Sequence, residues 1–407
     1  MKGRLRAISA MLCTLAFPTL AQDGWRDFYA EPGLNPEQLS TGQDVTESID
    51  LFSGNIQLSY RDLVVPGNGG LDITITRFYN VPQSLPAPGN PFGYGWTMHF
   101  GRITMGQNHV AQLCSEADNP DADTANNPQL EFADGGRSTL VRSAVLDDGT
   151  YITKDNWKAD CIDANDYTKG LVATAPNGTR YYMRDYSIMQ GETGAQGELA
   201  PISVSWLVDH IEDVHGNTIS IAYTQIATGL RLPERIDTSD GRRVDFSYVD
   251  EFDIPITPSS QNARLSLIES NGQQWQYVYS PLVELAPQWG VVQQYALDQV
   301  IRPDGTSWRY DYGTTPNSAE YQRLTQATYP FGGQVQYSYQ WLRPYAPRPD
   351  LKFAAIDTKT QTNPGQPTGT WRYEFSPGGA TYGEIGVSTG PEDAGRQADY
   401  TRVITPT

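Results

Sequence analysis

Residues 303–312 read PDGTSWRYDY, an Asp-Gly pair followed by rings at alternate positions. Trp308, Tyr310 and Tyr312 are separated by the polar residues Arg309 and Asp311. This period of two is typical of a strand with one buried face, whereas a helix would need apolar residues three and four positions apart. An Asp-Gly pair readily adopts the positive φ angles of a two-residue hairpin turn. The stretch therefore predicts the turn and second strand of a β-hairpin.

The same pattern recurs along the chain. Each copy has a leading leucine, a turn glycine and a closing tyrosine seven residues after that glycine. The five copies run over residues 206–223, 231–248, 264–279, 296–312 and 323–339, with the glycine and tyrosine pairs Gly216 and Tyr223, Gly241 and Tyr248, Gly272 and Tyr279, Gly305 and Tyr312, and Gly332 and Tyr339. All three alternate positions that end at each tyrosine are apolar or aromatic. We therefore expect an all-β fold of stacked antiparallel hairpins that bury one continuous face.

Degenerate copies extend the array. Residues 371–375 keep the alternation but lack a glycine at the usual offset. Asn177-Gly178 and Asp134-Gly135 indicate weaker copies before the array. After the last hairpin, the sequence predicts a free sheet edge that is only partly covered by residues 353–407, and unpaired edges recruit other strands.

The repeats resemble the YD repeats of the Rhs family, whose hairpins end in tyrosine and carry an Asp-Gly turn. The segment before them resembles the N-terminal opening of Rhs and YD-repeat proteins through the motifs DLFSGN (50–55), LSYRDL (58–63), PGNGGL (66–71), TRFYN (76–80) and GYGW (93–96). The resemblance covers roughly residues 44–375, with a poorly matched stretch from about 105 to 200. It implies a β-ribbon or solenoid that forms part of an open shell.

In many Rhs proteins the shell encloses a toxic C-terminal domain, which is released by self-cleavage. This sequence has only five or six clear repeats, and it lacks the Asp-Pro-x-Gly-Leu junction of the family. The resemblance therefore does not justify assigning a toxin activity or a self-cleaving aspartate here.

The first residues predict an export signal. Lys2, Arg4 and Arg6 precede an apolar run over 7–17, and Thr19-Leu20-Ala21 resembles a signal-peptide cleavage site. Cleavage after Ala21 would leave 26 basic against 47 acidic residues, a net charge of 26 − 47 = −21. The apolar run is too short for a membrane anchor. We expect a secreted, periplasmic or cell-surface protein with no membrane span after signal removal.

These features divide the sequence into six stretches. They are a signal peptide (1–21), an N-terminal linker (22–43), an Rhs-type N-terminal β segment (44–104), an irregular β region with an acidic loop (105–200), the repeat array (201–377) and a polar C-terminal tail (378–407).

Export makes Cys114 and Cys161, the two cysteines outside the signal, a candidate disulfide. Two unpaired thiols are the alternative, because sequence alone does not show whether the Cα atoms come within bridging distance. Asn119, Asp121 and Asp123 offer alternating oxygen ligands for calcium, but Thr124 replaces the loop glycine and Leu130 the closing carboxylate. A plain acidic loop is the alternative reading of residues 118–123.

The sequence predicts no catalytic, cofactor-binding or metal-binding residue. The four histidines lack metal-ligand spacing, and no Gly-x-Ser-x-Gly elbow or phosphate-binding loop is present. The net charge of −18 argues against nucleic-acid binding through phosphate contacts. The aromatic stripe is expected to be core, although exposed rings could instead stack on sugars.

These observations favour a non-catalytic scaffold or protein-interaction module. Its expected partner is another protein that pairs with the free sheet edge, or a second copy of the chain. A cell-surface glycan-binding adhesin is the alternative, and a carboxylate-dependent glycoside hydrolase is the second alternative.

Overall fold

A computed structural model describes most of the chain outside its two ends. The described residues are 45–51, 53–80, 91–106, 113–114, 127–142, 150–163, 169–193, 199–225, 230–250, 253–255, 263–282, 294–342, 353–375 and 401–406. The predicted signal peptide and the candidate calcium loop at Asp118–Asp123 lie outside them.

The fold is all-β, as predicted, with long antiparallel hairpins and no α-helix in the described ranges. A single 3-10 turn covers Asn68–Gly70. The strands are β1 Val45–Ile49, β2 Ile56–Val65, β3 Ile73–Asn80, β4 Trp96–Met98, β5 Arg102–Gly106, β6 Gln129–Glu131, β7 Arg137–Thr139, β8 Val141–Arg142, β9 Tyr151–Ile152, β10 Lys158–Asp163, β11 Lys169–Thr174, β12 Arg180–Thr193, β13 Leu199–Glu212, β14 Thr218–Gln225, β15 Arg231–Thr238, β16 Arg243–Val249, β17 Arg264–Ser270, β18 Gln273–Leu282, β19 Gln294–Ile301, β20 Ser307–Tyr312, β21 Leu324–Thr328, β22 Gln334–Leu342, β23 Phe353–Thr362, β24 Gly369–Phe375 and β25 Thr401–Ile404.

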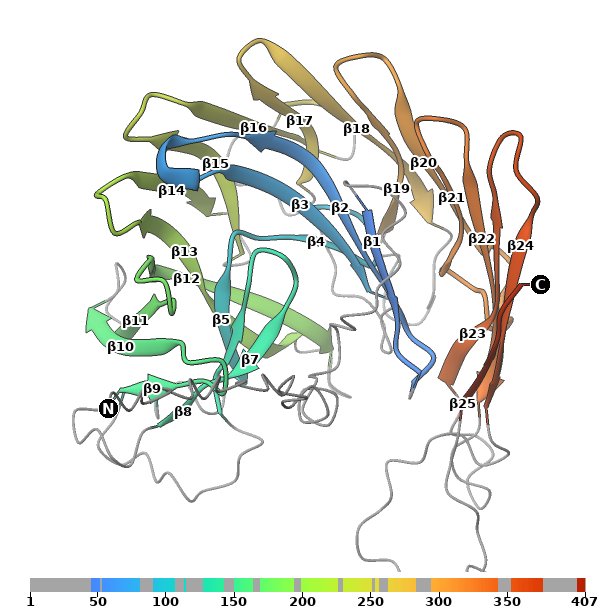
Figure 1. Cartoon of the computed structure of the whole chain (residues 1–407), viewed down its shortest axis with the longest axis horizontal. Helices are drawn as coiled ribbons and strands as arrows, with labels where there is room; N and C mark the ends of the chain where they lie inside the picture. The colour runs from blue at the N-terminus through green and yellow to red at the C-terminus, as the bar shows by residue number, and fades with distance from the viewer. Residues whose placement is uncertain are drawn as a thin grey trace, which may run out of the picture.

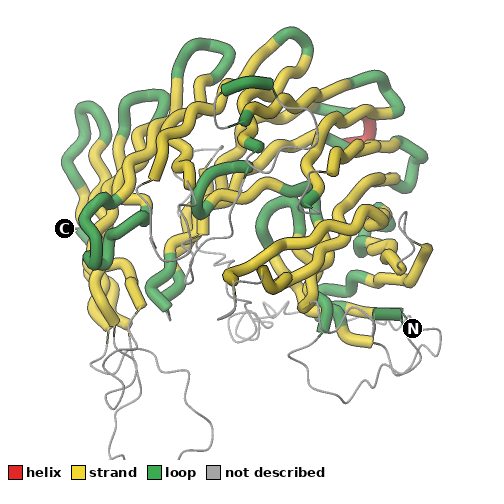
Figure 2. Tube along the Cα trace, turned by 180° about the vertical axis from the view of Figure 1, so that it is seen from behind, coloured by secondary structure: helices red, strands yellow, loops and turns green. Residues whose placement is uncertain are grey.

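Two sheets make up the described part of the molecule. We call β1–β4 the N-terminal sheet; its strands pair antiparallel in chain order. We call β13–β25, the longer part of the second sheet, the hairpin ribbon, in which each strand pairs with the next (Figure 1). One edge of β13 is shared, since β5 pairs with its residues 203–207 and β14 with its residues 210–212. The ribbon curves into an open arch with its turns along one rim (Figure 2).

The predicted hairpins are present. The five copies form the strand pairs β13–β14, β15–β16, β17–β18, β19–β20 and β21–β22, and the degenerate copy forms β23–β24. We number these hairpins one to six. The weaker copies at Gly178 and Gly135 are also hairpin turns, which join β11 to β12 and β6 to β7.

The turns correct one prediction. Asn271-Gly272 is the expected two-residue turn, with positive φ at both residues and Ser270 paired to Gln273. The other four array turns have three residues: Arg302 N–H donates to Thr306 O and Gly305 N–H donates to Arg302 O, and the same pattern recurs at Gly216, Gly241 and Gly332. In this turn only the glycine needs positive φ. The residue before it is therefore free to be His215, Asp240, Asp304 or Phe331.

The closing tyrosines tie each hairpin together. Four of them donate a hydroxyl hydrogen bond to the carbonyl fifteen residues earlier, on the first strand of the same hairpin. The bonds join Tyr223 to Val208, Tyr248 to Pro233, Tyr312 to Leu297 and Tyr339 to Leu324, at 2.7–2.9 Å. Tyr279 differs, because its hydroxyl donates to Pro91 O at 3.3 Å.

A β-bulge recurs at every closing tyrosine. Pairing with the next strand slips by one residue there and leaves one residue of that strand unpaired. The unpaired residues are all polar: Glu234, Ser266, Asp298, Thr325 and Asp357. Ser266 Oγ and Thr325 Oγ1 donate to backbone carbonyls of the preceding strand. Bulges bend a strand and increase its twist, so their repetition gives the ribbon its curvature.

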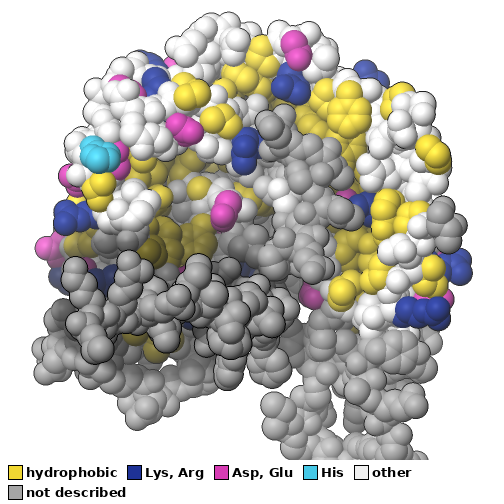
Figure 3. Space-filling model, in the orientation of Figure 1, with side chains coloured by type: hydrophobic (Ala, Val, Ile, Leu, Met, Phe, Trp, Pro, Cys, Tyr) yellow, Lys and Arg dark blue, Asp and Glu magenta, His cyan; other side chains and the backbone are white. Residues whose placement is uncertain are grey.

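The N-terminal sheet lies inside the arch and covers its concave face (Figure 1). Tyr60 packs against Trp308 and Tyr310 at ring-centroid distances of 4.9 and 5.5 Å, and Trp96 packs against Tyr310 at 4.8 Å. Hydrophobic side chains gather within the arch, and charged ones lie mainly around its rim (Figure 3). The sequence predicted that hairpins bury this face mostly against their neighbours. In the structure a separate sheet supplies much of the cover.

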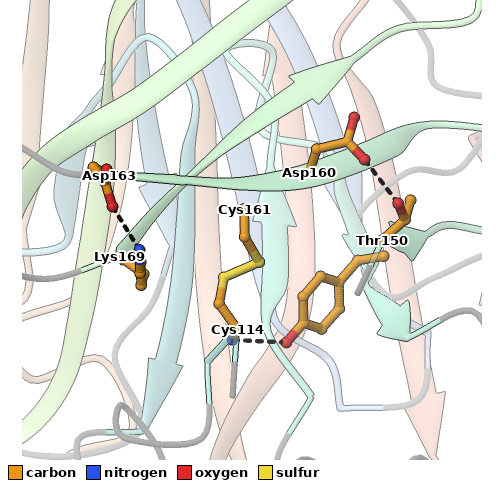
Figure 4. The surroundings of a disulfide bond; sticks show 7 residues. Cys114, Thr150, Asp160, Cys161, Asp163 and Lys169 are labelled. Atoms are coloured by element: carbon orange, nitrogen blue, oxygen red, sulfur yellow. Dashed lines mark hydrogen bonds and ion pairs between the residues drawn. A yellow bond between two sulfur atoms is a disulfide. The ribbon is translucent and has the colours of Figure 1, made fainter. Parts of the chain in front are cut away.

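A disulfide joins Cys114 to Cys161, with the Cα atoms 5.9 Å apart. Cys161 lies in β10, and the backbone N–H of Cys114 donates to the hydroxyl of Tyr151 in β9 (Figure 4). Thr150, next to β9, and Asp160 of β10 form a further bond at 2.8 Å. The bridge thus fastens residues 113–114 to the β9–β10 pair.

Candidate functional site

The interface between the N-terminal sheet and the hairpin ribbon contains four buried charged side chains, Glu47, Asp62, Arg77 and Lys359. The aromatic stripe consists of the three alternate positions that end at each closing tyrosine, fifteen residues in all, and it faces this interface. Twelve of these residues are buried, and Tyr223, Tyr279 and Tyr312 are partly buried. Trp275 and Trp308 retain only 6% and 5% of their surface. The stripe is therefore core, as predicted, and its tryptophans are not available as a sugar-stacking platform.

Arg77 and Asp62 form an ion pair at the centre of this interface. Arg77 continues the inward positions of β3 after Ile73 and Ile75. Asp62 is the bulged residue of β2, since Arg61 pairs with Thr76 and the next pair is Leu63 with Ile75. Arg77 Nε and Nη2 donate to the two Asp62 carboxylate oxygens at 2.5 and 2.9 Å, and each side chain is only 1% exposed.

The ribbon completes the surroundings of this pair. Tyr277 of hairpin three donates to Asp62 Oδ2 at 2.7 Å, and Arg77 Nη2 donates to the Tyr310 hydroxyl of hairpin four at 3.1 Å. The guanidinium lies 4.9 Å from the Trp96 ring centroid. Burial alone would lower the pKa of Arg77, but Asp62 together with Tyr310 and Tyr277 more than offsets this and raises it. The arginine stays charged and is held from both sheets.

Glu47 and Lys359 form a second buried pair further along the arch. Glu47 belongs to β1 and Lys359 to β23, and their side chains are each 6% exposed. Tyr337 of hairpin five donates to the other Glu47 oxygen at 2.8 Å, and Lys359 Nζ lies 5.0 Å from the Trp371 ring centroid. The local sequence does not predict this ion pair, because its two residues are 312 positions apart in the chain.

Further ties link the N-terminal segment to the remaining hairpins. At the rim, Arg242 of hairpin two donates to Val65 O at 2.8 Å and Leu71 O at 3.0 Å while bonding Asp240. The Arg242 and Thr238 bonds hold the pKa of Asp240 well below its usual range. In hairpin six, Ile356 N–H donates to Gly54 O at 2.9 Å. Hairpins two to six therefore each have at least one hydrogen bond to the N-terminal sheet or its loops.

His99 lies in a separate buried cluster beyond β4. Its ring stacks on Phe78 at 5.5 Å, and its Nδ1 accepts a hydrogen bond from Gly101 N–H. Burial, helped by Arg102, lowers the pKa of His99 to about 3. Glu131 bonds Arg102 and Arg137 at 2.6 and 2.9 Å. The histidine is neutral at physiological pH and its carboxylate neighbour is already occupied, so the cluster braces the junction of β4, β5 and β6.

The glycines and tyrosines that define the repeats form turns and hydrogen bonds within the fold. The five glycines occupy turns with φ of 73–87°, and the five tyrosines make the bonds described above. In the part of the chain that the structure describes, no three His, Cys, Asp or Glu side chains are grouped so as to hold a metal ion. No helix among those residues is long and apolar enough to cross a membrane.

Sequence reasoning missed the buried ions Glu47, Asp62, Arg77 and Lys359. Arg77 carried a signal, because it interrupts an otherwise apolar alternation after Ile73 and Ile75. Lys359 is flanked by threonines and gave none.

A comparison with protein families matches residues 46–115 to a model described as "Domain of unknown function (DUF6531)". The match spans the N-terminal sheet and β5, which are the segments that meet the concave face and the edge of β13. No curated protein matches the chain.

Several solved structures show similarity. The N-terminal domain of the effector protein SpvB from Salmonella typhimurium strain LT2 is 11% identical, with a TM-score of 0.29 over 74% of this chain and 98% of that one. A TcdB2–TccC3 structure is 12% identical, with a TM-score of 0.32 over 84% of this chain and 18% of that one. The Tc holotoxin pore of Photorhabdus luminescens is 12% identical, with a TM-score of 0.31 over 87% and 17%. TM-scores this low carry no argument about function.

Proposed function

We propose that this protein is an exported, non-catalytic β-ribbon scaffold that binds another protein, and that it is a short relative of the Rhs and YD-repeat proteins. The observation that carries the proposal is that the concave aromatic face is filled by the chain's own N-terminal sheet. The conspicuous rings and buried charges are thereby engaged in holding the fold. The family relationship is supported by the tyrosine-ended hairpins and by the matched N-terminal segment.

The interaction site of this proposal is the outer edge of β25. Its inner edge pairs with β24 from Arg372–Ile404 to Phe375–Thr401, and the described residues include no strand on its other side. Val403 and Ile404 are each 37% exposed. A β-branched edge strand with unpaired N–H and C=O groups favours the addition of another strand. A strand from a second copy is the partner that we propose first.

Light scattering across a range of concentrations tests this site. We expect the mature chain to self-associate, and we expect Val403→Lys with Ile404→Lys to shift it towards monomer, because edge lysines oppose strand pairing. Val278→Lys is the matched control, since Val278 is similarly exposed but lies on β18, which is paired on both edges. A mature chain that stays monomeric at every concentration would contradict self-association through β25.

The export part of the proposal has its own test. The intact mass of the chain recovered from the periplasm or medium of a bacterial host should correspond to a start at Gln22. A chain retained in the cytoplasm with residues 1–21 attached would count against export.

A further inference from the structure

The concave face of the ribbon repeats part of its pattern, because every hairpin ends its inward triplet with a tyrosine. This repeated part alone does not specify which hairpin meets which strand of the N-terminal sheet. Neighbouring strands lie about 4.7–4.9 Å apart, which puts successive hairpins about 10 Å apart. Each hairpin presents three inward side chains, and the last of the three is the closing tyrosine. If the N-terminal sheet moved along the arch by one hairpin, it would again meet a tyrosine at the last position of each triplet, although the size of the first residue would change at some hairpins.

Two inward positions change along the ribbon. The first is Ile219, Val244, Trp275, Trp308 or Val335, which differ in volume but carry no hydroxyl. The middle position differs in chemistry. The middle residue of the stripe is Ile221 in hairpin one and Phe246 in hairpin two, which have no hydroxyl. It is Tyr277, Tyr310 and Tyr337 in hairpins three, four and five. All five side chains are buried, with 3–6% of their surface exposed.

The three middle tyrosines coincide with the three buried charges of the N-terminal sheet. Tyr277 bonds Asp62, Tyr310 bonds Arg77 and Tyr337 bonds Glu47. The N-terminal segment reaches hairpin two through the Val65 and Leu71 carbonyls and the Phe100 ring, which faces Phe246 at 6.0 Å. Hydroxyls therefore stand in the stripe where the sheet is charged, and apolar side chains stand where it is not.

We infer that the middle inward residue of each hairpin determines the register in which the ribbon accepts the N-terminal sheet. The concave face thus fits a β-sheet that carries an anion, a cation and an anion opposite hairpins three, four and five. A shift by one hairpin towards β13 would bring Asp62 against Phe246, and it would separate Glu47 from Lys359. Burying a charge after removing its partner is strongly unfavourable, whereas replacing both members of a pair by apolar side chains is often tolerated.

Hydrogen exchange followed by mass spectrometry tests this inference on the full mature chain. Three amides report the register because they donate from the ribbon to the N-terminal segment: Leu265 to Pro91 O, Leu324 to the Tyr79 hydroxyl and Ile356 to Gly54 O. The wild type should show one protected population at each. The variant Glu47→Leu, Asp62→Leu, Arg77→Met and Lys359→Met keeps apolar bulk but removes the charges. We expect it to remain folded and to show two exchange populations at these amides.

The matched control is Arg243→Gln with Asp245→Asn, an ion pair whose side chains are 55% and 43% exposed on the outer face. It should leave a single population. A single protected population in the four-site variant would overturn the inference.

A less disruptive variant tests the inference if the four-site variant does not fold. Tyr277→Phe combined with Phe246→Tyr moves one hydroxyl by one hairpin and keeps every charge. We expect exchange at Leu265 to accelerate by about tenfold, the size of effect that a lost charge-assisted hydrogen bond gives. Unchanged exchange at Leu265, with Leu324 and Ile356 also unchanged, would contradict the inference.

Discussion

The closing tyrosine performs two tasks in one side chain. Its ring packs into the concave face, and in four of the five copies its hydroxyl donates to a backbone carbonyl on the same hairpin. Tyr248 is the clearest case, because it is buried and donates to Pro233 O at 2.8 Å. Phenylalanine would supply the ring but leave that carbonyl without its partner. This explains why the position is tyrosine in four copies, and in the fifth the hydroxyl of Tyr279 donates to Pro91 O instead.

We predict that Tyr248→Phe lowers the free energy of unfolding by about 1–2 kcal/mol, because a buried acceptor loses its hydrogen bond. Tyr60→Phe is the matched control. Tyr60 is equally well buried, but its hydroxyl has no hydrogen-bond partner among the described residues. Removal of the Tyr60 hydroxyl should leave the free energy of unfolding unchanged or raise it slightly. Urea denaturation of both variants measures the difference, and equal losses would show that the Pro233 bond contributes nothing.

At the scale of the hairpin, the turn glycine is required by backbone conformation alone. Gly305 has φ of 80°, and a Cβ atom there would meet nothing within 4 Å. The cost of a side chain is therefore conformational strain and not a clash. The three-residue turn explains why the preceding residue varies among the copies while the glycine does not.

We predict that Gly305→Ala destabilises the protein by about 1–2 kcal/mol, the cost of placing an L-residue in the left-handed region. Gly305→Asn should cost clearly less, since asparagine adopts this conformation more readily. Thermal denaturation of the two variants checks the order. Equal losses would point to a contact at this site instead of backbone strain.

The disulfide acts on a single structural element, the β9–β10 pair with residues 113–114. Its cysteines are 47 residues apart, a separation for which the chain-entropy model gives about 4 kcal/mol. We predict that Cys114→Ser with Cys161→Ser increases hydrogen exchange in residues 150–163 and leaves the ribbon at 264–342 protected. Wild-type protein under reducing conditions should behave like the variant. Loss of protection throughout the ribbon would show instead that the bridge supports the whole fold.

Hairpins, turn glycines and closing tyrosines were predictable because each is encoded within about eighteen residues. The bulges were not, because a slip of one residue depends on the pairing of one hairpin with the next. The cover of the concave face was least predictable: Asp62 meets Tyr277 across 215 residues, and Glu47 meets Tyr337 across 290. Local alternation shows that a face is buried but not which segment buries it.

At the scale of the whole molecule, the interior is unusually rich in tyrosine hydroxyls. Burial raises the pKa of Tyr248, Tyr277, Tyr312, Tyr337 and Tyr339 well above the ordinary value of 10.0. The folded state therefore holds these protons at a pH where the unfolded chain has lost them. The resulting contribution to stability is fully present below pH 10 and is lost as pH rises beyond it.

We predict a flat stability profile from neutral pH to about pH 9 and a steep loss above about pH 10. The part of the tyrosinate absorbance that comes from the buried hydroxyls should appear together with unfolding and not before it, because these hydroxyls ionise only when exposed. Parallel absorbance and circular dichroism titrations provide the measurement. Absorbance that corresponds to ionisation of every tyrosine, in a protein that circular dichroism shows to be folded, would contradict the burial described here.

The five hydrogen-bonded hairpins that reach the N-terminal sheet also bear on how many repeats this ribbon can hold. Val65 contacts hairpin two and Gly54 contacts hairpin six, so strand β2 and the loop before it extend across these five hairpins. The length of this segment therefore matches the number of hairpins that it contacts. An inserted seventh hairpin would have no hydrogen-bond partner on the N-terminal segment, and deletion of a hairpin would leave a group of that segment without its partner. Growth of such an array by duplication therefore has to be accompanied by a change in the length of its first sheet.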